Sequence, residues 1–189
     1  MLGELYRLWS GRNPQWEIRY EENIIRRFCD YGVGANNNTD NRARILGAGY
    51  EIFIIAFFIG LYSNRKRALF QDNNQRSSFG YPIINWGNSD RGGRRSYPKL
   101  REYIFIALIS RTDIDFIALE KGEITPYRAV DMLIQTMEEY ANYGFAFIED
   151  KLVYNPNYFY NERAFLEIFL SFGAPNANVA EDDEPEPLD

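Results

Sequence analysis

The chain has 189 residues and a formal net charge of −6, and 46% of its residues are apolar and 16% aromatic. This composition excludes collagen-like and intrinsically disordered chains, and it predicts a globular protein with a core of ordinary size. The sequence contains no histidine and a single cysteine, Cys29, which excludes histidine-assisted nucleophiles, Cys/His zinc sites and an intramolecular disulfide. We therefore expect no cofactor and no metal, and we interpret Cys29 as a small buried side chain.

The N-terminus lacks the basic and then apolar layout of a signal peptide, so the expected location is the cytoplasm. Residues 45–62 form one apolar run, in which Glu51 is the only charge. The run is long enough to raise the alternative of a membrane span. An ionised carboxylate near its middle would cost about 2.5–3.5 kcal/mol in a bilayer. We therefore favour a central helix that other helices surround, and no contact with a membrane.

The first half of the chain predicts helices separated by polar turns. Apolar positions recur at helical spacing in residues 2–9 and 15–29. A central apolar helix is then expected at about 42–62. Residues 63–96 lose this periodicity and are rich in Asn, Ser, Gly and Arg, which predicts a long irregular basic insertion. The expected fold class is mainly α, a multi-helix bundle around the 42–62 helix.

The next segment contains the signals of two more helices. Ser96 and Pro98 are typical of a helix start. Thr112 and Asp115 have the spacing of a capping box, which predicts a short helix that Gly122 ends.

The clearest helix of the sequence begins at Thr125 and has one apolar stripe, and we expect Gly144 to stop it. Residues 145–154 fit either a small β-hairpin or a helical continuation. A last helix, capped by Asn161, completes a single helical domain at residues 1–173. Residues 174–189 end in EDDEPEPLD, carry no apolar pattern and are expected to form an acidic, flexible tail.

Charge is unevenly distributed along the chain, and this is the main indication of function. Residues 42–101 contain eleven basic and three acidic residues, whereas residues 102–189 contain five basic and eighteen acidic residues. Such segregation predicts one surface that attracts polyanions and another that repels them.

We expect the basic segment 63–101 to bind the backbone of nucleic acid, because arginine binds phosphate oxygens with two N–H groups and aromatic rings stack on unpaired bases. The candidate backbone-binding residues are Arg65, Lys66, Arg67, Arg76, Arg91, Arg94, Arg95, Lys99 and Arg101. The candidate stacking residues are Tyr81, Trp86 and Tyr97. The predicted function is that of a non-catalytic accessory or regulatory subunit within a multiprotein complex or homo-oligomer. In the alternative, the protein is a scaffold subunit whose basic loop meets an acidic partner, and no nucleic acid is bound.

An enzyme is the least favoured reading of the sequence. Asp113 and Asp115 form a DxD pattern, which occurs in some metal-dependent transferases, but a role in capping the helix explains both acids. The pair Glu138-Glu139 is typical of a solvated helix face. Glu51, in an apolar helix, needs a buried partner, and we expect a structural ion pair in preference to a catalytic carboxylate. No phosphate-binding loop or metal motif is present, so no catalytic residue is assigned.

Overall fold

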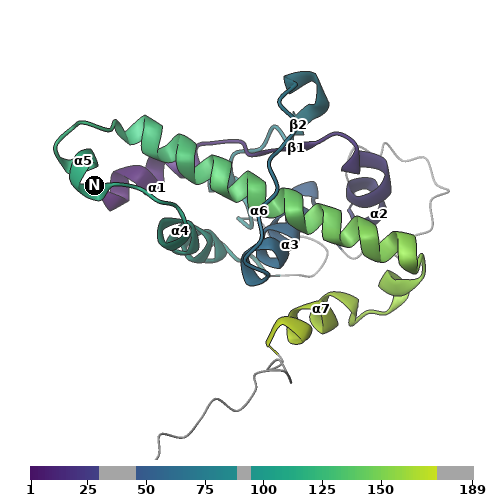
Figure 1. The fold of residues 1–189 in the computed structure, drawn as a ribbon. Helices are drawn as coiled ribbons and strands as arrows, with labels where there is room; N and C mark the ends of the chain where they lie inside the picture. Colours follow the sequence, from purple (N-terminus) through teal and green to yellow (C-terminus); the bar gives the residue numbers. More distant parts are fainter. Residues whose placement is uncertain (30–45, 89–94, 174–189) are drawn as a thin grey trace, which may run out of the picture.

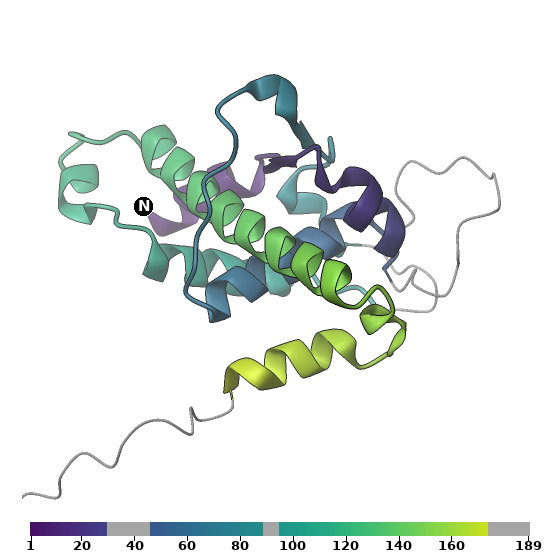
Figure 2. The same ribbon diagram turned by 45° about the vertical axis from the view of Figure 1, so that its right-hand side comes forward.

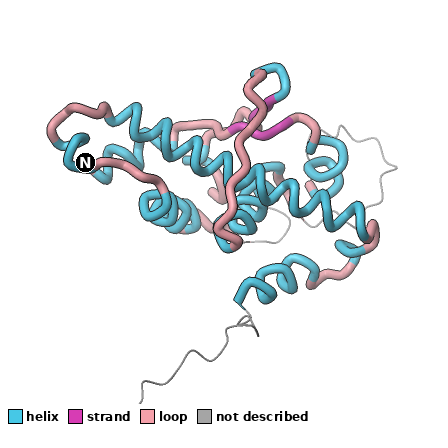
Figure 3. Tube along the Cα trace, viewed as in Figure 1, coloured by secondary structure: helices cyan, strands magenta, loops and turns pink. Residues whose placement is uncertain are grey.

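A computed structural model describes residues 1–29, 46–88 and 95–173 of the chain. These residues form the expected mainly α, multi-helix fold (Figure 1). The helices are α1 (Leu2–Ser10), a π-helical turn (Glu21–Ile25) that continues into α2 (Arg26–Phe28), α3 (Gly49–Tyr62), α4 (Leu100–Arg111), α5 (Phe116–Glu120), α6 (Pro126–Tyr154) and α7 (Ala164–Gly173). Figure 3 shows that the strands of the described residues are confined to one short antiparallel ribbon, β1 (Gln15–Glu17) and β2 (Arg76–Ser78).

Two helices, α3 and α6, form the centre of the fold, and they pack backbone to backbone. A Cβ atom added to Gly144 would lie 1.9 Å from the carbonyl oxygen of Ala56, and one added to Gly60 would lie 2.1 Å from that of Tyr140. Only glycine permits so close an approach. The predicted apolar helix is therefore central, as expected, and it shares this position with α6. It begins at Gly49 and not at about residue 42, because Ala48 has an extended backbone; residues 42–45 lie outside the described residues.

The alternative of a β-hairpin at residues 145–154 is wrong, because α6 continues to Tyr154. Gly144 does not stop the helix. Its lack of a side chain allows α6 to pack closely against α3 where the two helices cross. Beyond it, the buried residues Phe145, Ile148 and Leu152 recur at helical spacing, so the apolar stripe of α6 extends without a break.

The predicted helix at 15–29 is also wrong in its first part. Gln15–Glu17 pairs with Arg76–Ser78 as a strand, and Trp16 and Glu17 are buried there. This tertiary pairing overrides the local helical pattern. Cys29, at the end of the segment, is fully buried as expected.

The helix starts are partly as predicted. The side chain of Asp115 caps α5 by accepting a hydrogen bond from the Ala118 N–H group at 2.9 Å, so Asp115 and not Thr112 is the capping residue. Gly122 follows this helix with φ of 76°. The Thr125 side chain caps α6, as expected, through the Arg128 N–H group.

The insertion at 63–96 is irregular apart from two short 3-10 turns and β2 in its described part. It crosses the outside of α6 as an extended segment (Figures 1 and 2). The crossing is fixed by buried Asn142, whose side chain donates hydrogen bonds to the carbonyl oxygens of Arg67 and Ala68, and by buried Glu17, which accepts one from the Phe70 N–H group at 3.0 Å. After α6 the chain turns back, and α7 packs against α3 (Figure 2).

No helix of the described residues is both long and apolar enough to cross a membrane. The alternative of a span at 45–62 therefore gains no support from α3, which is 14 residues long.

Candidate functional site

One group of the predicted basic residues lies at the C-terminal end of α3. Arg65, Lys66 and Arg67 are consecutive and exposed. The Arg65 N–H group donates to the Gly60 carbonyl oxygen at 3.0 Å, and the Lys66 ammonium lies over the ring of Tyr140, 5.0 Å from its centre. These three cations remain available to an anionic partner.

A second group lies near the other end of α3. Arg95 and Lys99 are exposed, whereas Arg101 donates hydrogen bonds to the Trp86 carbonyl oxygen at 3.0 Å and to Asn88 Oδ1 at 2.6 Å. Since α3 has 14 residues, its two ends are about 20 Å apart. The described cations are therefore divided, and Arg101 serves the local structure.

Of the remaining three predicted cations, the structure describes one. Arg76, on β2, lies in a polar cleft beside α6. Arg91 and Arg94 lie outside the described residues. Nucleic-acid binding by these residues stays a prediction.

The three predicted stacking residues have partners within the protein. The Trp86 side chain is 1% exposed and stacks on Tyr50 at a ring distance of 5.3 Å, so in this conformation it offers no ring face to a base. Tyr81 is half-exposed and stacks on Tyr50 at 6.0 Å. The Tyr97 hydroxyl donates a hydrogen bond to Glu51 Oε1 at 2.9 Å.

Glu51 is buried in the first turn of α3, and hydrogen bonds satisfy its carboxylate. Its second oxygen accepts from the Gly47 N–H group at 2.9 Å. Burial, together with the hydrogen bond to Glu51, raises the pKa of Tyr97 far above its usual value. These two donors are a tyrosine hydroxyl and a backbone N–H group, so the expected structural ion pair of Glu51 stays a prediction.

An apolar pocket of about 380 Å³ lies between α3 and α7, lined by Phe58, Tyr62, Phe169 and Leu170. The rings of Tyr62 and Phe169 are in edge contact at 5.9 Å. Tyr62 is 65% exposed and Leu170 63% exposed. On α7 the exposed Leu166 lies one turn before Leu170, on the same face, so the apolar surface extends along the helix.

Three cations lie near the C-terminal end of α3, the end that carries Tyr62. Arg65 and Lys66 follow Tyr62 in the chain, and the Arg111 side chain reaches the same corner, where it donates a hydrogen bond to Asn64 Oδ1 at 3.3 Å. We call the apolar pocket with Arg65, Lys66 and Arg111 the α3–α7 surface. The sequence analysis identified two of its cations but missed its apolar part, because nothing in the spacing of Tyr62 and Leu170 distinguishes exposed from buried apolar residues.

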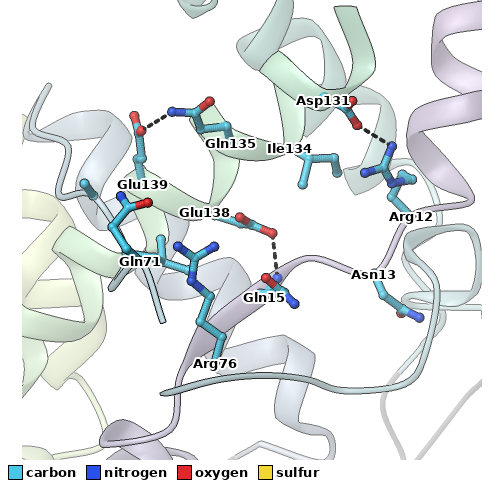
Figure 4. A pocket seen from close by; sticks show the side chains of 12 residues that line it. Arg12, Asn13, Gln15, Gln71, Arg76, Asp131, Ile134, Gln135, Glu138 and Glu139 are labelled. Atoms are coloured by element: carbon cyan, nitrogen blue, oxygen red, sulfur yellow. Dashed lines mark hydrogen bonds and ion pairs between the residues drawn. The ribbon is translucent and has the colours of Figure 1, made fainter. Parts of the chain in front are cut away.

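A second hollow, of about 510 Å³, is polar and lies where the N-terminal segment, the insertion and α6 meet (Figure 4). We call it the polar cleft. Its lining residues are Arg12, Asn13, Gln15, Ala68, Leu69, Gln71, Arg76, Asp131, Ile134, Gln135, Glu138 and Glu139. Glu138 points toward the middle of it and accepts a hydrogen bond from the Gln15 N–H group at 2.7 Å.

Burial raises the pKa of Glu138 to about 7. The Gln15 N–H group and the charges of Arg76 and Arg12 oppose this shift, and the neighbouring Glu139 adds to it. A pKa near neutrality permits a carboxyl group to accept or donate a proton. The sequence analysis placed Glu138 on a solvated helix face, because it did not foresee that the insertion would cover that face.

Other acidic candidates have structural partners. Asp115 caps α5, and Glu149 lies 3.7 Å from the Arg19 guanidinium in an ion pair. Within the described ranges, no group of three or more acidic or cysteine side chains is placed to hold a metal ion.

Comparisons of the chain with protein-family models, with curated proteins and with solved structures find no match.

Proposed function

We propose that the protein is a non-catalytic, protein-binding subunit whose α3–α7 surface docks an acidic, amphipathic segment of a partner protein. The observation that supports this most is the exposure of Tyr62, Leu166 and Leu170, which are 65%, 56% and 63% exposed, on one apolar surface. This proposal keeps the acidic protein partner of the second function that the sequence suggested, and it moves the main contact from the basic loop to the α3–α7 surface.

The composition of this surface resembles that of protein interfaces. Interfaces have an apolar core enriched in aromatic residues and a polar rim. Phe58, Tyr62 and Phe169 supply the aromatic residues, and Leu170 completes the apolar core. Burying an exposed leucine or tyrosine side chain contributes about 1.5–3 kcal/mol, so a partner that covers this surface gains enough to offset part of the entropy lost on association.

The charge beside the pocket determines the kind of partner. Arg65, Lys66 and Arg111 add positive charge near the end of α3 that carries Tyr62, which favours a partner segment with acidic residues and raises its rate of association. The hollow is small, so one or two apolar side chains fill it. An amphipathic helix, with apolar side chains three or four residues apart and acids between them, meets both requirements.

Selection of peptides from a displayed random library against the full chain tests this function. We expect the enriched peptides to combine net negative charge with apolar residues at helical spacing. Leu170→Glu should weaken their binding at least tenfold, whereas Ile106→Glu, at an equally exposed position on α4 (63%), should leave it within twofold. Basic or purely polar peptides, or equal loss in both variants, would contradict the proposal, and so would a dimer of the chain that Leu170→Glu dissociates.

Nucleic-acid binding is a second candidate, favoured by one observation: Arg65, Lys66 and Arg67 are exposed side by side on the extended segment that crosses α6. Fluorescence anisotropy with a labelled single-stranded oligonucleotide over a salt series tests it. If this function holds, affinity falls steeply with salt, and replacement of the three residues by Ala abolishes it. The paired control Arg128→Ala/Arg163→Ala, at two exposed arginines outside the predicted site, retains most of it. Absence of binding at low salt would reject this candidate.

A further inference from the structure

The polar cleft contains hydrogen-bonding groups that the protein itself does not use. The side chains of Asn13, Gln15 and Gln71 make no hydrogen bond to any residue in the described part of the chain. Arg76 donates through Nε to the Phe70 carbonyl oxygen, and its two terminal nitrogens have no hydrogen-bond partner among those residues. These groups line a cavity of about 510 Å³, within the range of small-molecule sites.

The charges around the cleft nearly cancel. Arg12 and Asp131 form an ion pair at 2.7 Å on its rim, and Gln135 donates a hydrogen bond to Glu139 at 2.8 Å. Arg76 and Glu138 face each other at its centre (Figure 4). A strongly anionic ligand would meet the three carboxyl groups, and a cationic ligand would meet the two guanidinium groups, so the cleft disfavours both.

An uncharged ligand that is rich in groups that both donate and accept hydrogen bonds suits this balance of charges best. Hydroxyl groups do both. The carboxyl, guanidinium and amide groups of the cleft are planar, and each presents two polar atoms, an arrangement that matches a pair of neighbouring hydroxyls. Leu69 and Ile134 add two apolar contacts to the lining, which suit the C–H groups of a sugar ring.

From this combination we infer that the polar cleft binds an uncharged polyhydroxylated small molecule of the monosaccharide class, with Arg76, Gln71 and Glu138 as the main contacts. The site lies on the N-terminal segment, the insertion and α6, and shares no lining residue with the α3–α7 surface. A negative result for one of the two proposals therefore leaves the other unaffected.

Because the pKa of Glu138 is about 7, we expect ligand binding at this site to depend on pH. Arg12, Arg76, Asp131 and Glu139 are the charged groups that line the cleft with it. Protonated Glu138 both donates and accepts a hydrogen bond, whereas its carboxylate only accepts. The affinity for a hydroxylated ligand is therefore expected to differ between pH 6 and pH 8.

Saturation-transfer NMR on the full chain with glucose, galactose, mannose and N-acetylglucosamine tests the site. We expect saturable binding of at least one sugar, weakened at least tenfold by Arg76→Ala. Gln71→Ala, which removes an exposed side chain without an internal hydrogen bond, should weaken it about threefold and keep the fold intact. The Leu170→Glu variant should bind the sugar with the same affinity as the wild type. No saturable signal with any of the four sugars, or wild-type affinity in both cleft variants, would overturn the inference.

Discussion

Gly144 of α6 lies directly against Ala56 of α3, so closely that a methyl group on Gly144 would fall 1.9 Å from the Ala56 carbonyl oxygen. The obstacle is backbone, which cannot rotate away as a side chain can. We therefore expect Gly144→Ala to lower the free energy of unfolding by about 3 kcal/mol or more, because the two central helices must separate. Urea denaturation followed by circular dichroism measures this.

Gly3→Ala is the matched control for this substitution. Gly3 lies in α1, and a Cβ atom there would meet nothing within 4 Å. Alanine is the better helix former, so the control should be neutral or more stable by up to about 1 kcal/mol. Equal stability of Gly144→Ala and the wild type would show that α3 and α6 do not cross at this point.

The hydrogen bond between Tyr97 and Glu51 predicts a second effect on stability. Tyr97→Phe leaves the buried carboxylate without this donor and should cost about 1–3 kcal/mol. Tyr103→Phe, at a 64% exposed position on α4, should change stability by less than about 0.5 kcal/mol. Since the pKa of Tyr97 is raised above 10.0, the wild type should also lose stability as the pH rises above 10, and this loss should be smaller in Tyr97→Phe.

Glu138 predicts a pH dependence of stability. Its pKa is raised from 4.5 in the unfolded chain to about 7 in the folded protein, so the folded state binds the proton more tightly. The stabilisation is full below pH 4.5 and is lost as the pH rises through 7. Glu138→Gln, whose side chain is uncharged, should therefore be more stable than the wild type at pH 8, by about 1–2 kcal/mol after allowance for solvent screening.

Thermal unfolding at pH 5 and pH 8 measures this difference, with Glu120→Gln as the control for the loss of one exposed charge on α5. The gain at pH 8 should be much smaller at pH 5 and be absent from Glu120→Gln. An equal gain at both pH values would mean that Glu138 does not titrate in this range.

The acidic residues after α7 predict competition at the α3–α7 surface. Six acids lie in residues 174–189, and they follow a helix whose Phe169 contacts Tyr62. Removal of 174–189 should raise the affinity for an acidic peptide a few-fold at low salt, because like charges near the site repel it, and the gain should fade at high salt. Unchanged affinity at low salt would reject this effect.

The fold was predictable where local pattern and tertiary packing agree. The apolar stripe from Val130 to Ala141 identified α6, and the caps at Thr125 and Gly122 lie where expected. The pattern failed at Gly144 and at Gln15–Glu17, because a helix crossing and a strand pairing with the distant segment Arg76–Ser78 decided those structures. Such contacts leave little trace in local spacing.

The candidate sites were less predictable for the same reason. Charge clustering selected the exposed residues Arg65 and Lys66, but it also selected Arg101, which binds loop carbonyls. The choice of stacking rings selected Trp86, which is buried. Cation and aromatic content alone cannot tell a surface residue from a structural one. The polar cleft depends on an insertion folding over α6, and a sequence pattern does not report that contact.

The central proposal is tested most directly by photo-crosslinking of a selected acidic peptide to the full chain. The cross-linking residue p-benzoylphenylalanine replaces Tyr62 in one sample and Tyr103 in the other; the two tyrosines are 65% and 64% exposed. We predict that the peptide crosslinks at position 62 and not at position 103. Crosslinking at position 103 alone, or equally at both positions, would contradict docking on the α3–α7 surface.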